Sequence, residues 1–480
     1  MRARAFTHLL TAAALSGVVA LAAVGSMGLM SRWLDDAPGP VEIAPGQVLK
    51  VDREALARVD LERVHSELVP NWVVARGGLR GTHFEQLRRE AGHDPNLGAI
   101  LRRMRLLSDN DAMLNASELL GLVSTWNAYL DAAGEPWRME GEILLSQGSS
   151  TGASSLLALR TYKIIHDGHT RVGDRAYRTL VQRRADDTTQ VEAYLGHMRS
   201  WERGVILLHD RIRGYALDEV WPLLDPDHLP PDPIAAAFAP SLRAAVRDGL
   251  GSQVADKLEA TAAHRRRMIE SVSSVHGRHR CGSQFLISRI PWNGFQAADV
   301  TRLQIHAAAA AHQTCPDVRP EEAAALVDGS QALQATPGLR DAAERLTAWV
   351  AGAVAIHEAR HAADDARIDE EGHFACTGCP AELGRVEALE ASAYLASFAA
   401  PHQGVVSMYQ ACALDPDKLP GRAAAVAFLA DRIGTTCREG PPEDLSLRSR
   451  GVEIDLFGRL TPVDLQDFPV SLPVAEVRGR

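Results

Sequence analysis

The sequence predicts a mainly α-helical protein with a few short β-strands, which is an α+β fold. Apolar residues recur at spacings of three and four along much of the 480-residue chain, as expected for amphipathic helices. Alanine-rich runs are frequent and aromatic residues make up only 5% of the chain, which favours helices packed closely through small side chains. With 46% hydrophobic and 23% charged residues, the chain has the composition of a globular protein that buries a core.

The first element is an N-terminal signal anchor or signal peptide over residues 1–33. Arg2 and Arg4 precede residues 5–31, a stretch that contains no charged side chain. This stretch is long enough for a spanning helix, which needs roughly 20 apolar residues, and "AAVGS" at 22–26 is also compatible with a signal-peptide cleavage site. Both alternatives export the rest of the chain, either anchored in the inner membrane and facing the periplasm or extracellular side, or secreted.

Residues 34–47 form a Pro/Gly-rich linker, and residues 48–225 are predicted to be a helical domain of unknown role. Helical spacing is clear over 96–134 and is also assigned to 173–212. The sequence "PNWVVARGG" (70–78) predicts a short strand within this region.

The segment "LLDPDHLPPDPIAAAFAP" (223–240) carries five prolines, so we place a domain boundary there. The following domain, 240–440, contains a predicted strand at 280–292 and two helices, at 338–367 and 381–400. A polar loop at 368–380 joins these helices. The tail, 441–480, is predicted to be irregular with one possible strand, "VEIDLF" (452–457).

Six cysteines, all in the second half of the chain, agree with export to an oxidising compartment. They predict disulfides, and six cysteines allow 15 pairings among which the sequence does not choose. In the loop "GHFACTGCP" (372–380), His373, Cys376 and Cys379 have spacings that also suit a second metal or a redox C-x-x-C pair. A disulfide that stiffens this loop is the preferred interpretation.

The stretch "VAIHEARHAADD" (354–365) contains the candidate site. Residues i and i+4 of a helix lie about 40° apart on one face, so His357 and His361 can direct two imidazoles at one ion. Glu358 lies beside this pair, where a carboxylate can take a proton from a metal-activated water. The pattern H-E-x-x-H is typical of zinc hydrolases, although an ordinary helix with polar pairs on its surface is the alternative.

A third ligand is available on the next predicted helix, in "VEALEASAY" (386–394). Either Glu390 or Glu387 can be presented toward the histidines, because a loop of sufficient length separates the two helices. An H-E-x-x-H helix followed by a helix that supplies a Glu ligand resembles the gluzincin branch of the zincin metallopeptidases, over about residues 340–400.

The resemblance implies a minimal zincin-like domain within 240–440 that binds Zn²⁺ through His357, His361 and Glu390. Glu387 is the alternative third ligand; Glu390 is preferred because "EASAY" is similar to the E-A-x-A-Y form of several minimal domains of this kind. The resemblance also implies that Glu358 is the general base and later the proton donor.

The sequence departs from the gluzincin pattern at two positions. Tyr394 occupies the place where an Asp often orients a histidine, and we expect its phenol to hydrogen-bond an imidazole or a developing oxyanion, with plain packing as the alternative. Arg360 fills a motif position that is usually uncharged, and we expect it to pair with Asp364, its i+4 neighbour, with binding of a substrate carboxylate as the alternative.

The expected function is that of an exported zinc metallopeptidase of bacterial type, tethered to the membrane by its N-terminal helix and acting on a peptide or protein substrate. The alternative is a non-catalytic scaffold or binding protein of the cell envelope with a structural or relict zinc site. A thiol–disulfide protein using Cys376 and Cys379 is a third hypothesis. The net charge of −10 and the lack of a basic stripe argue against nucleic acid as a partner.

Overall fold

The computed structural model describes ten segments of the chain. They are residues 50–75, 78–111, 115–146, 154–186, 194–199, 204–277, 319–374, 376–380, 383–465 and 467–474. Several predictions fall outside these segments: the anchor at 1–33, the linker at 34–47, the strand at 280–292, and any role of Cys281 and Cys315.

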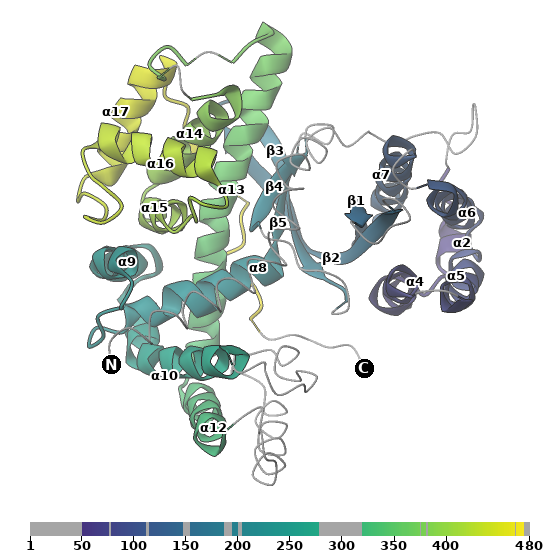
Figure 1. The fold of residues 1–480 in the computed structure, drawn as a ribbon, viewed down its shortest axis with the longest axis horizontal. Coiled ribbons are helices and arrows are strands. Elements are labelled where there is room, and N and C mark those ends of the chain that lie inside the picture. The colour runs from purple at the N-terminus through teal and green to yellow at the C-terminus, as the bar shows by residue number, and fades with distance from the viewer. Residues whose placement is uncertain are drawn as a thin grey trace. The chain divides into compact units, whose positions relative to one another are not determined.

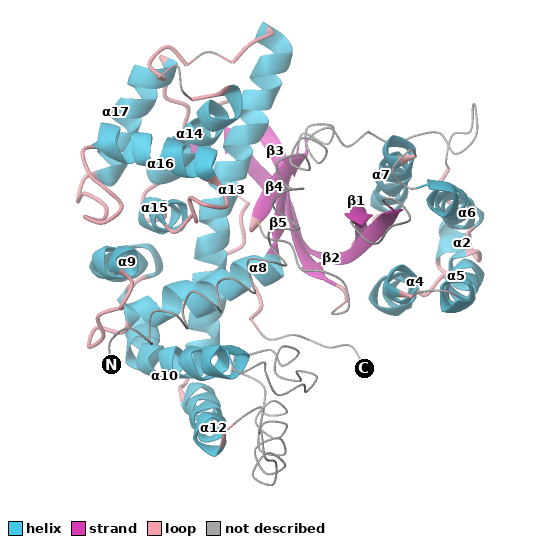
Figure 2. Cartoon of the chain, viewed as in Figure 1, coloured by secondary structure: helices cyan, strands magenta, loops and turns pink. Residues whose placement is uncertain are grey.

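The described residues are mainly helical, with their strands in one sheet, so the mainly α, α+β fold class is confirmed (Figure 2). They form two compact units. The N-terminal unit comprises the described parts of 31–168 and 178–210. The C-terminal unit comprises 169–177, the tip of one hairpin, together with the described residues from 211 onward.

The N-terminal unit begins with a layer of helices whose inward faces form one core, including the buried side chains of Trp72, Phe84 and Trp126. The helical elements are α2 (Arg53–Leu56), α3 (Leu61–Arg63), η1 (Val64–Leu68), α4 (Val69–Val74), α5 (Gly78–Ala91), α6 (Pro95–Asp111) and α7 (Ala116–Ala133). The helices predicted over 96–134 are therefore confirmed as α6 and α7.

A curled sheet follows, in the order β1-β2-β3-β5-β4. Its strands are β1 (Trp137–Ser146), β2 (Ser154–Val172), β3 (Arg175–Arg184), β4 (Gly196–Arg199) and β5 (Gly204–Leu208). β1 pairs antiparallel with β2, β4 pairs antiparallel with β5, and β3 and β5 are parallel. Asn127 on α7 joins the helical layer to β1, because its side chain both accepts from Met139 N and donates to Met139 O, each at 2.8 Å.

Two predictions for this region are wrong. Within 173–212, where helices are predicted, the described residues form β3, β4 and β5, and only the last four belong to a helix, α8 (His209–Gly214). In β3 the buried apolar residues Tyr177, Leu180 and Val181 are spaced i, i+3, i+4, which imitates a helical pattern. The strand predicted at 70–78 is instead α4, whose Pro70 lies at the first turn, where proline fits a helix, and whose Trp72 packs edge-on against Phe84.

The C-terminal unit is built around one long helix, α13 (Leu339–Glu371), with α14 (Arg385–Phe398) and α15 (Gly404–Cys412) packed against it (Figure 1). These helices confirm the predictions at 338–367 and 381–400. The remaining elements are α8 (His209–Gly214), η2 (Tyr215–Val220), η3 (Trp221–Leu224), α9 (Pro233–Leu250), α10 (Ser252–Gly277), α12 (Pro320–Ala335), α16 (Pro420–Ile433), α17 (Leu445–Phe457) and β6 (Val463–Asp464).

The structure also corrects the prediction for the tail. Residues 445–457 form α17, so "VEIDLF" is helical and not a strand. Its buried residues Val452, Glu453, Leu456 and Phe457 have helical spacing. Within the proline-rich segment, α9 already begins at Pro233, and the Asp232 side chain caps it by accepting from Ala235 N at 2.9 Å.

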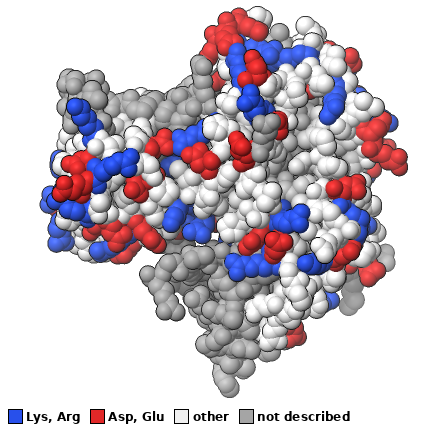
Figure 3. Space-filling model, turned by 180° about the vertical axis from the view of Figure 1, so that it is seen from behind, with Lys and Arg blue, Asp and Glu red and all other residues white. Residues whose placement is uncertain are grey.

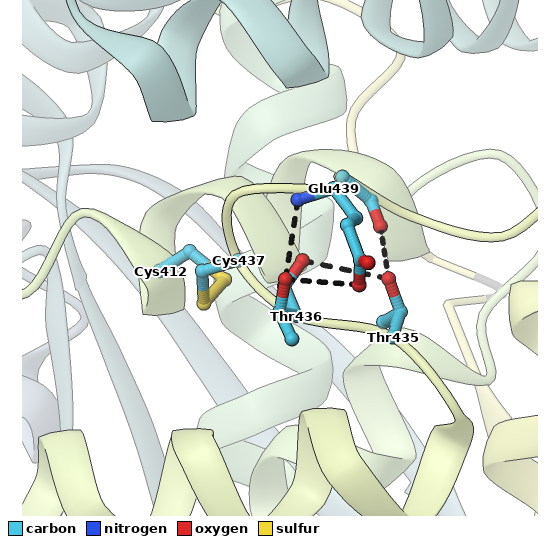
Figure 4. Close-up of a disulfide and its surroundings, with 6 residues drawn as sticks. Cys412, Thr435, Thr436, Cys437 and Glu439 are labelled. Atoms are coloured by element: carbon cyan, nitrogen blue, oxygen red, sulfur yellow. Dashed lines mark hydrogen bonds between the residues drawn. A yellow bond between two sulfur atoms is a disulfide. The ribbon is translucent and has the colours of Figure 1, made fainter.

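Two disulfides lie in the C-terminal unit, as the prediction of disulfides requires. Cys376–Cys379 closes a turn in the loop after α13. Cys412–Cys437 joins the end of α15 to the loop after α16, and the neighbouring backbone is held by Thr436 and Glu439, whose side chains hydrogen-bond at 3.0 Å (Figure 4). Both bonds therefore restrain loops that connect the helices around α13.

The charge of the surface is relevant to binding of nucleic acid, and the apolar character of the helices is relevant to binding of a membrane. On the face shown in Figure 3, basic and acidic side chains are interspersed. None of the helices within the described segments combines the length and the apolar character that crossing a membrane requires.

Candidate metal centre

The helix that carries the histidines is shaped by small side chains. The stretch of α13 from Ala348 to Ile356 is buried throughout and contains four alanines and one glycine, so neighbouring helices can approach it closely. The helix ends at Gly372, which adopts the left-handed conformation (φ 75°) that favours glycine at a helix C-terminus. The chain can then turn and return as α14, which packs along α13.

This packing brings together three of the predicted ligands. The Nε2 atoms of His357 and His361 lie 3.2 Å apart. Oε2 of Glu390, on α14, lies 3.6 Å from the first and 3.9 Å from the second. Among the described residues, this is the group of His, Cys, Asp and Glu side chains whose ligand atoms are close enough to share one ion.

The donor set fits a zinc ion. Bond lengths of about 2.0–2.2 Å at tetrahedral angles place neighbouring ligand atoms roughly 3.3–3.5 Å apart, close to the three separations found here. Oε2 of Glu390 is also buried and has no hydrogen-bond partner among the described residues. An unpaired buried carboxylate oxygen is costly, and a cation between it and the two imidazoles removes that cost.

The ionisation states suit metal binding. Burial lowers the pKa of His361 to about 3, so its imidazole is neutral at physiological pH and offers a lone pair. Burial by itself would raise the pKa of Glu390, but Arg422 and the two histidines outweigh this effect and hold the pKa well below its ordinary value. Glu390 is therefore a carboxylate beside neutral imidazole.

The other predicted ligand, Glu387, lies elsewhere. Its carboxylate packs against Gly384 and Gly421 and does not belong to the cluster formed by Glu390 and the histidines. The two glutamates are three residues apart, so they differ in direction by about 60° around α14. This difference is enough to separate their carboxylates.

The two predicted catalytic side chains lie beside the histidine pair. The ring of Tyr394 packs against that of His357, with centroids 4.7 Å apart. Burial raises the pKa of Tyr394 above its ordinary value, and the carboxylates of Glu390 and Glu358 raise it further. Tyr394 is therefore a protonated phenol at neutral pH, able to donate a hydrogen bond. Glu358 is half-buried on α13, next to His357.

Arg360 pairs with Asp364, as the sequence predicts, at 3.2 Å. The side chain is buried and makes two further contacts: its Nε donates to Ser392 Oγ on α14 at 2.9 Å, and Nη1 lies 3.0 Å from Glu453 on α17. Arg360 therefore holds α14 and α17 against the turn of α13 that carries the histidines.

Sequence reasoning missed Arg422. Its Nη2 lies 2.7 Å from Glu390 Oε1, so one carboxylate oxygen is engaged by the guanidinium while Oε2 faces the histidines. Arg422 lies near the start of α16, 32 positions after Glu390, and no motif in the sequence marks it. The ion pair orients Glu390 as a ligand through a single oxygen.

Replacing Arg422 with Gln is expected to weaken zinc binding about 10- to 100-fold, the usual effect of removing a group that orients a metal ligand. Competition with a chromogenic chelator measures the zinc affinity. The matched control is Arg432→Gln on the same helix, where Arg432 lies 3.8 Å from Asp455 and is similarly exposed. Equal zinc affinity in the Arg422 and Arg432 variants would show that Glu390 needs no such support.

The loop that contains the C-x-x-C pair is closed by a disulfide. Cys376 and Cys379 are bonded to each other, and His373 is exposed with its Nδ1 2.9 Å from Glu371 O. The three side chains do not form a second metal cluster within the described residues.

Comparison of the chain with protein-family models, with curated proteins and with solved structures finds no match.

Proposed function

We propose that the C-terminal unit is a zinc-dependent peptidase in which His357, His361 and Glu390 hold the ion. The observation that carries this proposal is the buried, unpartnered Oε2 of Glu390, placed 3.6 and 3.9 Å from two imidazole nitrogens that are themselves 3.2 Å apart. The placement of Glu358 directly after the first histidine, as in H-E-x-x-H zinc hydrolases, supports hydrolysis rather than a purely structural site.

A bound zinc ion would supply Lewis acidity, both lowering the pKa of a water molecule and polarising the scissile carbonyl. Glu358 accepts a proton from the attacking water at its carboxylate and later donates that proton to the leaving amine. Tyr394, protonated at neutral pH, donates a hydrogen bond toward the oxyanion that develops on the carbonyl oxygen. Arg422 keeps Glu390 in place during this cycle.

We further propose that the enzyme acts on peptides or proteins outside the cytoplasm, attached to the membrane by its N-terminal segment. The uncharged stretch 5–31 after Arg2 and Arg4, and the two disulfides of the C-terminal unit, support export.

The test is a peptide-library cleavage assay on the purified full chain, in three states: as isolated, after removal of metal by a chelator, and after reloading with Zn²⁺. We expect cleavage that disappears with the chelator and returns with zinc. Cleavage that persists without metal would exclude the proposed chemistry. Zinc binding without cleavage of any peptide would favour the alternative, an envelope scaffold with a structural zinc site.

A further inference from the structure

A second candidate site is a cavity of about 280 Å³ in the C-terminal unit, and all of its lining residues belong to that unit. One wall is a stripe of α13 that includes Arg360, Asp364 and Arg367, at helical spacing. Arg459, in the segment after α17, and Arg175, at the tip of the β2–β3 hairpin, contribute to the other walls.

The carboxylates and the arginines around this cavity differ in how many of their polar atoms have partners. Both oxygens of Asp364 are engaged, Oδ2 by Arg360 Nε at 3.2 Å and Oδ1 by Arg459 Nη2 at 2.7 Å. At the more exposed edge, Arg175 pairs with Glu370 at 2.7 Å. Asp364 and Glu370 are thus already paired with arginines. The lining also includes Asp174 and Glu371, and Glu371 lies 3.9 Å from Arg367.

The arginines, by contrast, have donors to spare. Arg360 Nη2 and Arg459 Nε are buried and have no hydrogen-bond partner among the described residues. A buried N–H without an acceptor costs about 1–3 kcal/mol, and more when the group is charged. Both residues line the cavity.

We propose that this cavity binds a small oxyanion, either a carboxylate or a phosphate, through Arg360 and Arg459. Guanidinium groups match the geometry of these anions and bind them through charge-assisted hydrogen bonds. The volume is below the roughly 300–1,000 Å³ of sites for drug-sized ligands, which limits the ligand to a small molecule or a single side-chain-sized group.

The site is distinct from the metal centre but mechanically connected to it. Arg360 donates to Ser392, which lies two residues after Glu390 on α14. An anion that contacts Arg360 therefore acts on the side chain that holds the ligand-bearing helices together. The binding itself does not depend on the proposed peptidase function.

The test is isothermal titration calorimetry on the full chain at constant ionic strength, after metal is removed with a chelating resin so that the histidine cluster does not bind the probe. The two probes are succinate and inorganic phosphate. We expect saturable binding of one equivalent of at least one probe, and a response to succinate, to phosphate or to both identifies the class of anion.

Arg459→Met is expected to weaken the binding at least about 10-fold, whereas Arg432→Met, an exposed arginine of the same unit, leaves it unchanged. Arg459→Lys keeps a positive charge for Asp364 but lacks the Nε donor, so it answers the question if the Met variant does not fold. The proposal is overturned if the unmodified protein binds neither probe, or if the Arg459 variants bind as tightly as the Arg432 control.

Discussion

Replacing Glu358 with Gln is expected to leave zinc binding intact and to reduce the rate of peptide hydrolysis at least about 100-fold. The amide has the size of the carboxylate but cannot accept a proton from water, and general-base catalysis typically contributes about 10²–10⁴ to the rate. Zinc content should be unchanged because the ligand cluster consists of His357, His361 and Glu390.

Two measurements on the same sample check this prediction: the zinc-to-protein ratio and kcat/KM for a peptide found in the cleavage assay. A matched control is Glu344→Gln, also on α13, where the half-buried Glu344 forms an ion pair with the exposed Arg340 at 3.1 Å. The control should hydrolyse peptides at the unmodified rate. Full activity of the Glu358 variant would disprove the proposed role of this residue.

Replacing Arg360 with Met is expected to lower the free energy of unfolding of the C-terminal unit by about 3–5 kcal/mol, as when one partner is removed from a buried ion pair. Glu453 would remain buried without this arginine, and Asp364 would keep Arg459 as its one remaining arginine partner. Burial already raises the pKa of both carboxyls, and Arg360 is the strongest influence in the opposite direction.

Denaturant unfolding followed by hydrogen exchange of peptides from α13 and α14 measures this loss in the unit concerned. Arg247→Met serves as the control, because Arg247 is an exposed arginine that pairs with Asp256 and Glu259, each at 2.8 Å, and exposed pairs contribute about 1 kcal/mol or less. A loss in the Arg360 variant no larger than in the control would mean that the buried network adds little to stability.

Patterns of neighbouring residues correctly predicted the features that depend only on residues close together in the sequence. His357 and His361 share a helical face because of their spacing, and the long α13 follows from its alanine-rich apolar pattern. The same reasoning failed for β3, where the buried apolar residues Tyr177, Leu180 and Val181 have the spacing of a helix although they belong to a strand. In α4, tertiary packing of Trp72 prevails over the strand propensity of its valines.

The candidate site shows the same limit. The sequence predicts Glu390 as a ligand if one helix folds back along the other. The choice of Glu390 over Glu387 depended on the resemblance to known zincins. Arg422 and Glu453 could not be predicted, because each meets its partner through packing of helices distant in sequence. Nothing in the residues around either one indicates a role at the site.

The most direct test of the zinc site is the zinc K-edge X-ray absorption spectrum of the zinc-loaded full chain. It should show imidazole nitrogens at about 2.0–2.1 Å and oxygen at about 2.0–2.2 Å from the zinc. We expect Glu390→Gln to change this spectrum and Glu387→Gln to leave it unaltered. A sulfur shell near 2.3 Å, or a spectrum indifferent to Glu390→Gln, would place the ion elsewhere and contradict the account.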